Sequence, residues 1–360
     1  MTIKHFAITA IALASAAGAQ AQAANPNTSV TLYGVLDAYV QTAHGASSLS
    51  RVQSGGLSGS RFGLKGTEDI GGGLRGLFTI ESGINLDDGT NGQGAFWGRQ
   101  AFVGLGSSTL GTLTLGRQYG SIYALSSDFS EFSNGPIGAS TAVIGGFGGY
   151  EPVRGSANAA NGNGGPARVN NSIKVESISF NGFKGGALLG LGEVAGSTTK
   201  TRVADVYGRY TAGPLDAMVS VIDDRIAATG FSERTVSAAA AYGFGDARVT
   251  GGVISVNDRN ITNVDGEGYW IGGDYRMGLN LFKAQVLVSK LKNSDGKTQA
   301  VGAGYQYDLS KRTSLYSSLT YFKNEGTGYT DRWASSLPAG LTSASDRNIT
   351  ELAAGIRHSF

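Results

Sequence analysis

Segments of about ten residues, in which apolar and polar side chains alternate, recur along the whole chain. Alternation with a period of two indicates a β-strand whose two faces meet different surroundings. Residues 313–323 are an example, with Leu315 and Leu319 on one face and Ser314 and Ser318 on the other. About ten residues is also the length that a tilted strand needs to cross a membrane. The pattern therefore predicts membrane-crossing strands rather than helices.

Short and long connections alternate between these segments. Seven short ones are rich in Gly, Asn and Asp, which suits tight hairpin turns; they lie at 68–72, 106–111, 181–185, 213–214, 243–246, 277–280 and 308–312. Eight longer, polar ones lie near 43–56, 84–96, 119–167, 193–201, 224–232, 257–268, 291–298 and 323–346. Together they join sixteen strands, with the contrast in length expected between periplasmic turns and extracellular loops.

The strands must form a closed barrel if they lie in a membrane, because lipid cannot satisfy an open sheet edge. After residue 23 no run of roughly 18 apolar residues occurs, so no transmembrane helix is expected there. We predict an all-β fold, a transmembrane antiparallel β-barrel of sixteen strands that forms one domain over residues 24–360. A soluble sandwich or β-helix is the alternative, but neither gives a reason for alternating loop lengths.

The last segment alternates as well and stops at an aromatic residue. We expect it to pair with the first strand, with Phe360 facing lipid and Arg357 facing water. Aromatic residues near segment ends suggest interfacial girdles; they are Tyr33, Tyr39, Phe78, Tyr210, Tyr242, Tyr275, Tyr305, Tyr307, Tyr321 and Phe360.

Residues 1–23 have the features of an export signal. Lys4 precedes an apolar run, and the following alanines offer A-x-A cleavage sites, so we expect cleavage after Ala23, with Ala21 as the alternative. Its removal takes the 29 basic residues to 28 against 27 acidic ones, a balance that argues against a nucleic-acid partner.

The composition also argues against an enzyme. Cys is absent, and the three His residues, at 5, 44 and 358, are too scattered to form a metal or acid–base site. No G-x-S-x-G or H-E-x-x-H motif occurs, and the glycine-rich stretch at 190–196 has no Walker lysine after it. We expect no catalytic residues, no cofactor and no metal.

Residues 119–167 form by far the longest predicted connection. A loop of this length is usually functional or disordered, and in a barrel it can also fold into the lumen and narrow it. Its acidic residues Asp128 and Glu131 would then lie in the pore.

Basic residues on the polar faces of several strands could face this loop. They are Arg61, Lys65, Arg99 and Arg168, and Glu81 lies on the polar face of a neighbouring strand. Acidic groups on one side and arginines on the other would create a transverse field that sets ion selectivity. The alternative is that these are ordinary lumen-lining or salt-bridging charges.

Five stretches of the chain resemble the general diffusion porins of Gram-negative outer membranes, in particular the betaproteobacterial type. They are SVTLYGVLDAYV at 29–40, SRFGLKGTEDIGGGLRGLFTIESG at 60–83, GRQAFVGLGSSTLGTLTLGRQYGSIY at 98–123, RVNNSIKVES at 168–177 and the terminal GIRHSF. Together they extend over nearly the whole chain after residue 23.

The resemblance implies a homotrimer of sixteen-stranded barrels in which the third loop folds into each lumen. It places the family's basic pore wall on Arg61, Arg99 and Arg168, the acidic loop residues on Asp128 and Glu131, and Arg117 at the root of the loop. It also implies that Phe360 is an outer-membrane assembly signal. Ser130 stands where enterobacterial relatives have a proline, and the Gly-rich insert lengthens the loop.

These expectations describe a channel in the cell outer membrane, in contact with bilayer lipid and lipopolysaccharide. Ions and small hydrophilic solutes would cross it by passive diffusion, with weak to moderate preference for anions because three wall arginines outnumber two loop acids. A substrate-specific channel for small anionic solutes is the alternative, and a surface adhesin is a second. Surface loops could also act as antigens or phage receptors.

Overall fold

The computed structural model describes residues 28–133, 135–137, 167–192, 194–197, 201–225, 232–258, 265–292, 295–326 and 348–360. The expected export signal at 1–23 lies outside the described residues. The expected pore loop at 119–167 is described only in part, over 119–133, 135–137 and 167. No helix among the described residues is long and apolar enough to cross a membrane.

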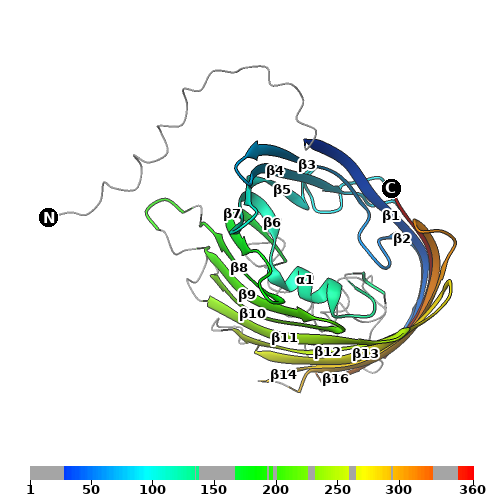
Figure 1. The fold of residues 1–360 in the computed structure, drawn as a ribbon. Coiled ribbons are helices and arrows are strands. Elements are labelled where there is room, and N and C mark those ends of the chain that lie inside the picture. Colours follow the sequence, from blue (N-terminus) through cyan, green and yellow to red (C-terminus); the bar gives the residue numbers. More distant parts are fainter. Residues whose placement is uncertain are drawn as a thin grey trace.

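One antiparallel sheet contains all the strands and closes on itself, as Figure 1 shows. The strands are β1 (Ser29–His44), β2 (Ser48–Ser54), β3 (Arg61–Gly71), β4 (Leu74–Gly83), β5 (Gln100–Ser107), β6 (Gly111–Tyr119), β7 (Arg168–Ser177), β8 (Phe183–Gly190), β9 (Val203–Ala212), β10 (Leu215–Arg225), β11 (Ser232–Phe244), β12 (Ala247–Asp258), β13 (Gly266–Met277), β14 (Asn280–Leu291), β15 (Lys297–Asp308), β16 (Thr313–Glu325) and β17 (Ile349–Ser359). One helix, α1 (Ser121–Asp128), lies inside the ring of strands.

The seventeen strands make a barrel of sixteen, because β2 and β3 are two parts of one wall strand. The first half of β1 pairs with β3, and its second half pairs with β2. Residues 55–60 interrupt the wall strand between these parts. The prediction of a first surface loop at 43–56 is therefore wrong. Strands β1 and β2 form a hairpin, and only residues 45–47 connect them. The all-β barrel of sixteen strands is confirmed.

Pairing between β1 and β17 closes the barrel. Their register runs from Val35 opposite Ser359 to His44 opposite Thr350. Phe360 continues it, because its backbone N–H donates to the Gly34 carbonyl (3.1 Å) and its carbonyl accepts from the Gly34 N–H (3.0 Å). A Cβ on residue 34 would lie 2.3 Å from the Phe360 ring, so only glycine leaves room for this ring. Phe360 lies on the outer face and Arg357 on the inner one, as expected.

The two faces of the barrel wall differ as the alternation predicts. Exposed apolar side chains such as Val103, Val219 and Ile271 cover the outside. Aromatic pairs on the outside mark the short-turn edge, for example Phe282 with Tyr305, whose ring centroids lie 5.4 Å apart. These features match a lipid-facing band bounded by an interfacial girdle.

Tyr33 and Tyr39 were expected in this girdle, and that interpretation is wrong. Tyr33 donates a hydrogen bond from its hydroxyl to Glu81 (2.8 Å) inside the barrel, and Tyr39 is buried in an inner cluster. Both lie on the same strand face as Asp37, which is also turned inward. Strand parity therefore decides their direction, whereas distance from a segment end does not.

Candidate pore constriction

Helix α1 begins where the chain leaves β6 and turns into the lumen (Figure 1). Gly120 has no side chain to cap the helix, and Asp205 of β9 takes that place. Its carboxylate accepts hydrogen bonds from the Ser121 backbone N–H and from the Ser121 hydroxyl, both at 2.6 Å. Free N–H groups and the helix dipole favour a carboxylate at this end. A wall residue thus fixes the direction in which the loop enters the lumen.

The apolar side of α1 packs on the inner wall. Ile122, Leu125 and the following Phe129 are buried in one cluster with wall residues that include Met218 and Trp270. Apolar side chains on the inner face of a water-filled barrel would be exposed to water if nothing covered them. Their position therefore shows where the loop packs on the wall. Burial of each of the larger side chains stabilises the docked loop by roughly 1.5–3 kcal/mol.

Polar bonds hold the end of α1 to the same wall. Asp128 forms an ion pair with Arg209 of β9 (2.7 Å), and Arg248 of β12 donates to the Asp128 carbonyl. The indole N–H of Trp270, on β13, donates to the Phe129 carbonyl (2.7 Å). Carbonyls at the end of a helix lack partners within it, so these donors stabilise the end of α1.

Glu131 lies against the wall rather than in open lumen. Its carboxylate accepts from the Thr250 hydroxyl (2.6 Å), its backbone N–H donates to Gln285 (2.9 Å), and its side chain is almost fully buried. Burial raises the pKa of Glu131 to about 7; the Thr250 hydrogen bond opposes this rise, and the neighbouring Asp274 adds to it. Glu131 therefore carries only part of a negative charge at neutral pH.

The described residues that follow α1 pack on the interruption between β2 and β3. Phe132 and Ile137 pack in a cluster with Leu57, which belongs to this interruption. The carboxylate of Asp37 on β1 holds the interruption in place. It accepts the backbone N–H groups of Gly56 (3.1 Å), Leu57 (2.9 Å) and Ser58 (3.0 Å). A fixed segment of the wall thus supports Phe132 and Ile137 of the loop.

Glu81 joins two of the expected basic residues. Its carboxylate accepts from Arg99 Nε (2.8 Å) and forms a longer ion pair with Arg61 Nε (3.7 Å). It also accepts from the hydroxyls of Tyr33 (2.8 Å) and Tyr119 (2.5 Å). Two guanidinium groups share one carboxylate, so this cluster keeps a net positive charge.

Arg168 completes the basic cluster through aromatic rings. Tyr119 and Tyr123 stack in parallel with centroids 3.7 Å apart. The Arg168 guanidinium lies 5.5 Å from the first ring and 5.8 Å from the second. Such cation–π contacts stabilise a guanidinium without cancelling its charge. Arg168 Nε has no hydrogen-bond partner among the described residues.

The two other basic residues lie beside this cluster. Lys65 is exposed on β3, with its ammonium 5.3 Å from the Tyr33 ring centroid. Arg117 donates from Nε to the Gly98 carbonyl (2.7 Å) and from Nη1 to Asn170. Arg117 therefore joins β6 and β7 to the end of the second surface loop.

Among the expected residues, the structure brings together Arg61, Arg99, Arg168 and Glu81. Asp128 and Glu131 lie elsewhere, on the β9–β14 wall, each with a wall partner. Sequence reasoning missed the two tyrosines and Asp37. Asp37 follows the inward parity of its strand, which was the available signal. Tyr119 shares the parity of the outward Leu113 and Leu115, and it faces inward because the register shifts between Gly116 and Gln118. Tyr123 had no such signal. Arg209 has the inward parity of β9, but its pairing with Asp128 depends on the path of the loop.

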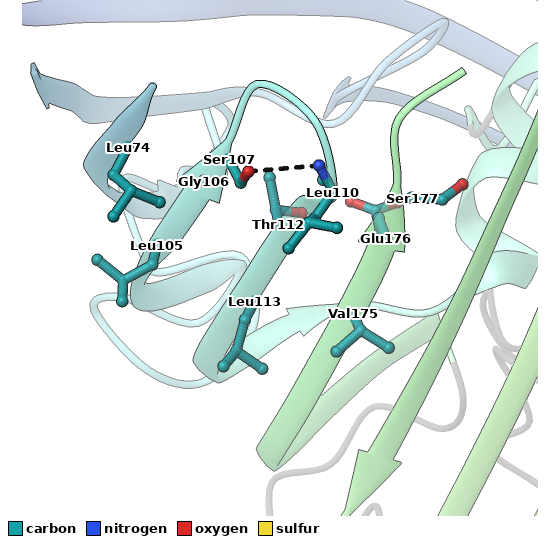
Figure 2. A pocket seen from close by; sticks show the side chains of 11 residues that line it. Leu74, Leu105, Gly106, Ser107, Leu110, Thr112, Leu113, Val175, Glu176 and Ser177 are labelled. Atoms are coloured by element: carbon teal, nitrogen blue, oxygen red, sulfur yellow. Dashed lines mark hydrogen bonds between the residues drawn. The ribbon is translucent and has the colours of Figure 1, made fainter. Parts of the chain in front are cut away.

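An apolar groove of 430 Å³ also occurs, but it lies apart from this cluster. It is lined by Leu74, Leu105, Leu113 and Val175 beside the β5–β6 turn, and these side chains extend from the outer face, as Figure 2 shows. The turn is closed by a hydrogen bond from the Leu110 N–H to the Ser107 hydroxyl (3.3 Å). The groove belongs to the lipid-facing surface and has no part in the constriction.

Comparison with known proteins agrees with this geometry. Residues 7–327 match the family model of the Gram-negative porins. The chain is 31% identical to outer membrane porin protein 32 of Delftia acidovorans, over 98% of this chain and 99% of that protein. It is 30% identical to an outer membrane porin of Bordetella pertussis, over 99% and 100% of the two chains.

Among solved structures, an anion-selective porin from Comamonas acidovorans matches with a TM-score of 0.77. It is 26% identical to the chain, and the match covers 92% of this chain and all of that one. A family match of this extent, two full-length relatives and the closed barrel lead to one conclusion. The chain belongs to the Gram-negative porins, which are outer-membrane channels.

Proposed function

We propose that this porin is a water-filled channel for passive diffusion of small hydrophilic solutes, with weak to moderate preference for anions. The cluster of three arginines around the single carboxylate of Glu81 carries the proposal. Fixed positive charge inside a low-dielectric wall raises the local concentration of anions and lowers that of cations. The solved relative described as anion-selective supports the same direction.

The acidic residues of the loop weaken this field less than their number suggests. Asp128 shares Arg209 with Asp216, and Arg248 donates to its carbonyl, so positive groups surround it. Glu131 is buried, and its pKa near 7 leaves it partly neutral. The proposed roles are therefore a basic wall of Arg61, Arg99, Arg168 and Lys65, supported by Arg117, and a loop whose acids mainly hold it to the barrel.

Reversal potentials in a salt gradient across planar bilayers test the proposal. Arg61→Ala combined with Arg168→Ala is expected to reduce the chloride-to-potassium permeability ratio several-fold. Arg276→Ala is the control, because this residue pairs with Asp308 (2.7 Å) on the inner face near the short-turn edge, away from the cluster. A cation-selective wild type, or equal effects of the variant and its control, would contradict the assignment.

A substrate-specific channel for small anions is the second candidate function. The Arg168 guanidinium beside the stacked tyrosines favours this candidate, since guanidinium groups bind carboxylate and phosphate groups. Block of the chloride current by micromolar amounts of one anion, with the block lost in Arg168→Ala, would support it. Equal and weak block by all anions would support general diffusion.

We also propose that the protein assembles as a homotrimer. The outer face of β17, β1 and β3 carries apolar residues such as Leu32, Leu36 and Leu352. Phe62, Phe96 and Trp97 form an aromatic cluster beside this face, with centroids 4.7–6.0 Å apart. An apolar face without charge can be covered by a second copy at little desolvation cost. The family's channels act without catalysis, and we propose no enzymatic role.

A further inference from the structure

The interruption of the wall strand at residues 55–60 leaves the sheet and returns to it at one point. Both of its ends bind the backbone of Asp37 on β1. The Gly55 N–H donates to the Asp37 carbonyl (2.6 Å), and the Ser60 hydroxyl donates to the same carbonyl (3.0 Å). The Ser60 hydroxyl also accepts the Asp37 N–H (3.0 Å). Between these ends the chain turns into the lumen, where Leu57 lies in the inner cluster described above.

The side chain of Asp37 holds the inward part of the interruption. Its carboxylate accepts the N–H groups of residues 56, 57 and 58 at 2.9–3.1 Å, and it also accepts the Tyr316 hydroxyl of β16. Hydrogen bonds to an ionised acceptor are roughly twice as strong as those between neutral groups. The side chain is fully buried, so its charge does not face the lumen. Asp37 thus fixes the backbone of the interruption from the wall side.

The other side of the interruption holds Arg61 of the basic cluster. Its Nη1 donates to the Ser58 hydroxyl and to the Gly59 carbonyl, both at 2.8 Å. Its Nε lies 3.7 Å from the Glu81 carboxylate, which is beyond hydrogen-bond distance. The interruption therefore sets the direction of the Arg61 guanidinium, and Glu81 contributes a longer ion pair.

The interruption also limits the position of Arg99. A Cβ on residue 59 would lie 3.0 Å from Arg99 Nη1, so Gly59 allows this guanidinium to lie against the backbone. Glu81 binds the same guanidinium through Nε (2.8 Å). The two acceptors that the interruption offers to Arg61 are uncharged, and its contact with Arg99 adds no carboxylate. Both guanidinium groups are therefore held in place without loss of their charge.

We propose that Asp37 is a positioning residue for anion preference, which acts through residues 56–59 on the guanidinium groups of Arg61 and Arg99. The proposal rests on the proposed function and adds the element that places its basic wall. Its sign separates it from a simple effect of charge. Removal of a negative charge from the wall would by itself make the lumen more positive and raise the preference for anions. Displacement of Arg61 would lower that preference.

Reversal potentials of the full mature protein in a salt gradient test the proposal. Asp37→Asn is expected to lower the chloride-to-potassium permeability ratio roughly two-fold, because a displaced guanidinium keeps part of its effect on the lumen. The same substitution in an Arg61→Ala background should have at most a small further effect, since the residue through which it acts is then absent. Asp69→Asn removes an equal charge from an exposed turn of the same wall strand and is the matched control. It should keep or slightly raise the ratio.

Ser58→Ala is a second variant, which removes one acceptor of Arg61 and leaves Asp37 in place. It should lower the ratio in the same direction by a smaller factor. An unchanged or raised ratio in Asp37→Asn, or an equal loss with and without Arg61, would overturn the proposal. If Asp37→Asn forms no channels, an unchanged ratio in Ser58→Ala overturns it instead.

The same recordings separate this proposal from the proposed function. A wild type that prefers cations would contradict the proposed function. A wild type that prefers anions, with a ratio that Asp37→Asn leaves unchanged, would contradict the positioning role alone.

Discussion

Glu81 makes the basic wall possible although it is itself acidic. Without a shared carboxylate, the guanidinium groups of Arg61 and Arg99 would repel each other and turn apart. The carboxylate holds both on one patch of wall and still leaves an excess of positive charge. Sequence parity placed Glu81 in the lumen but could not reveal its partners. The register that puts Glu81 opposite Gly63, beside Arg61, is a property of the folded sheet.

Glu131 gives the docked loop a dependence on pH. Its pKa is about 7 in the docked loop and near 4.5 in a free one, so docking binds a proton between these values. Docking is therefore strongest below about pH 4.5, weakens as pH rises from there to about 7, and does not change further above that pH. Hydrogen exchange of the amides of residues 121–133, corrected for intrinsic rates, should show protection that falls from about pH 4.5 to about pH 7 and is level above about pH 7.5.

Glu131→Gln imitates the protonated side chain and should abolish this dependence while keeping the loop docked. Glu68→Gln, which changes an exposed carboxylate near a periplasmic turn, is the control and should behave as the wild type. If Glu131→Gln retained the full pH dependence, another group would be responsible.

At the scale of elements, the interruption of the wall strand at residues 55–60 is the least regular part of the sheet. Asp37 satisfies three of its backbone N–H groups, and Leu57 packs with Phe132 and Ile137 of the pore loop. Asp37→Asn keeps the size of the side chain but removes the charge and one acceptor. Because hydrogen bonds to charged groups are worth about 1.5–3 kcal/mol, exchange of the Gly56, Leu57 and Ser58 amides should accelerate about 10- to 100-fold.

A matched substitution separates this effect from a general loss of charge. Asp69→Asn changes a carboxylate that accepts the Gly71 N–H (2.9 Å) in an exposed turn of the same wall strand. It should leave the exchange of residues 56–58 at the wild-type rate. Equal acceleration in both variants would mean that Asp37 has no particular role in holding the interruption.

Regular elements followed from the sequence, and irregular ones did not. Strands such as β16 have one polar and one apolar side, so a period of two finds them. The sequence predicts a loop at 55–60, because Gly55, Gly56 and Gly59 break the alternation of apolar and polar residues. The pairing of β1 with both β2 and β3, and the hydrogen bonds to Asp37, show that these residues belong to the wall. The apolar inner residues Met218 and Trp270 depend on the loop in the same way.

At the scale of the whole molecule, the outer surface has two sectors of different chemistry. The face formed by β17, β1 and β3 is apolar except for Glu68 at its short-turn end, whereas β13 to β16 carry exposed ion pairs such as Glu267 with Lys290 and Glu325 with Lys297. If the face formed by β17, β1 and β3 is the interface between protomers, Leu36→Trp should prevent trimer formation, because a packed interface has no space for the larger ring. Size-exclusion chromatography with light scattering in mild detergent would then show monomers.

Val219→Trp is the control on a lipid-facing strand, where lipid can accommodate the larger ring. It should leave the trimer intact. Trimers that survived Leu36→Trp, or dissociation in both variants, would place the interface elsewhere on the barrel.

The barrel and its closure were predictable because they obey one rule, that lipid requires every strand to be paired. Alternating loop lengths supplied the strand number, and Phe360 supplied the closing pair. The constriction was predictable only in part. Arg61, Arg99 and Arg168 come together as expected, but the direction of Asp128 and Glu131 depends on which wall the loop contacts. Arg209 and Thr250, which decide this, lie about 80 to 120 residues further along the chain.

The attachment of the pore loop has a mechanical consequence. Contacts with β9, β12, β13 and β14 fix the described part of the loop to one part of the wall. Tyr123 accepts a hydrogen bond from Arg99, and Phe132 packs with Leu57, so the same segment is also fixed to another part of the wall. The position of this segment in the lumen therefore follows the cross-section of the barrel itself. Flattening the barrel by lateral tension or by a mismatched bilayer thickness would change the aperture directly. Conductance in this channel is thus linked to the elasticity of the surrounding membrane.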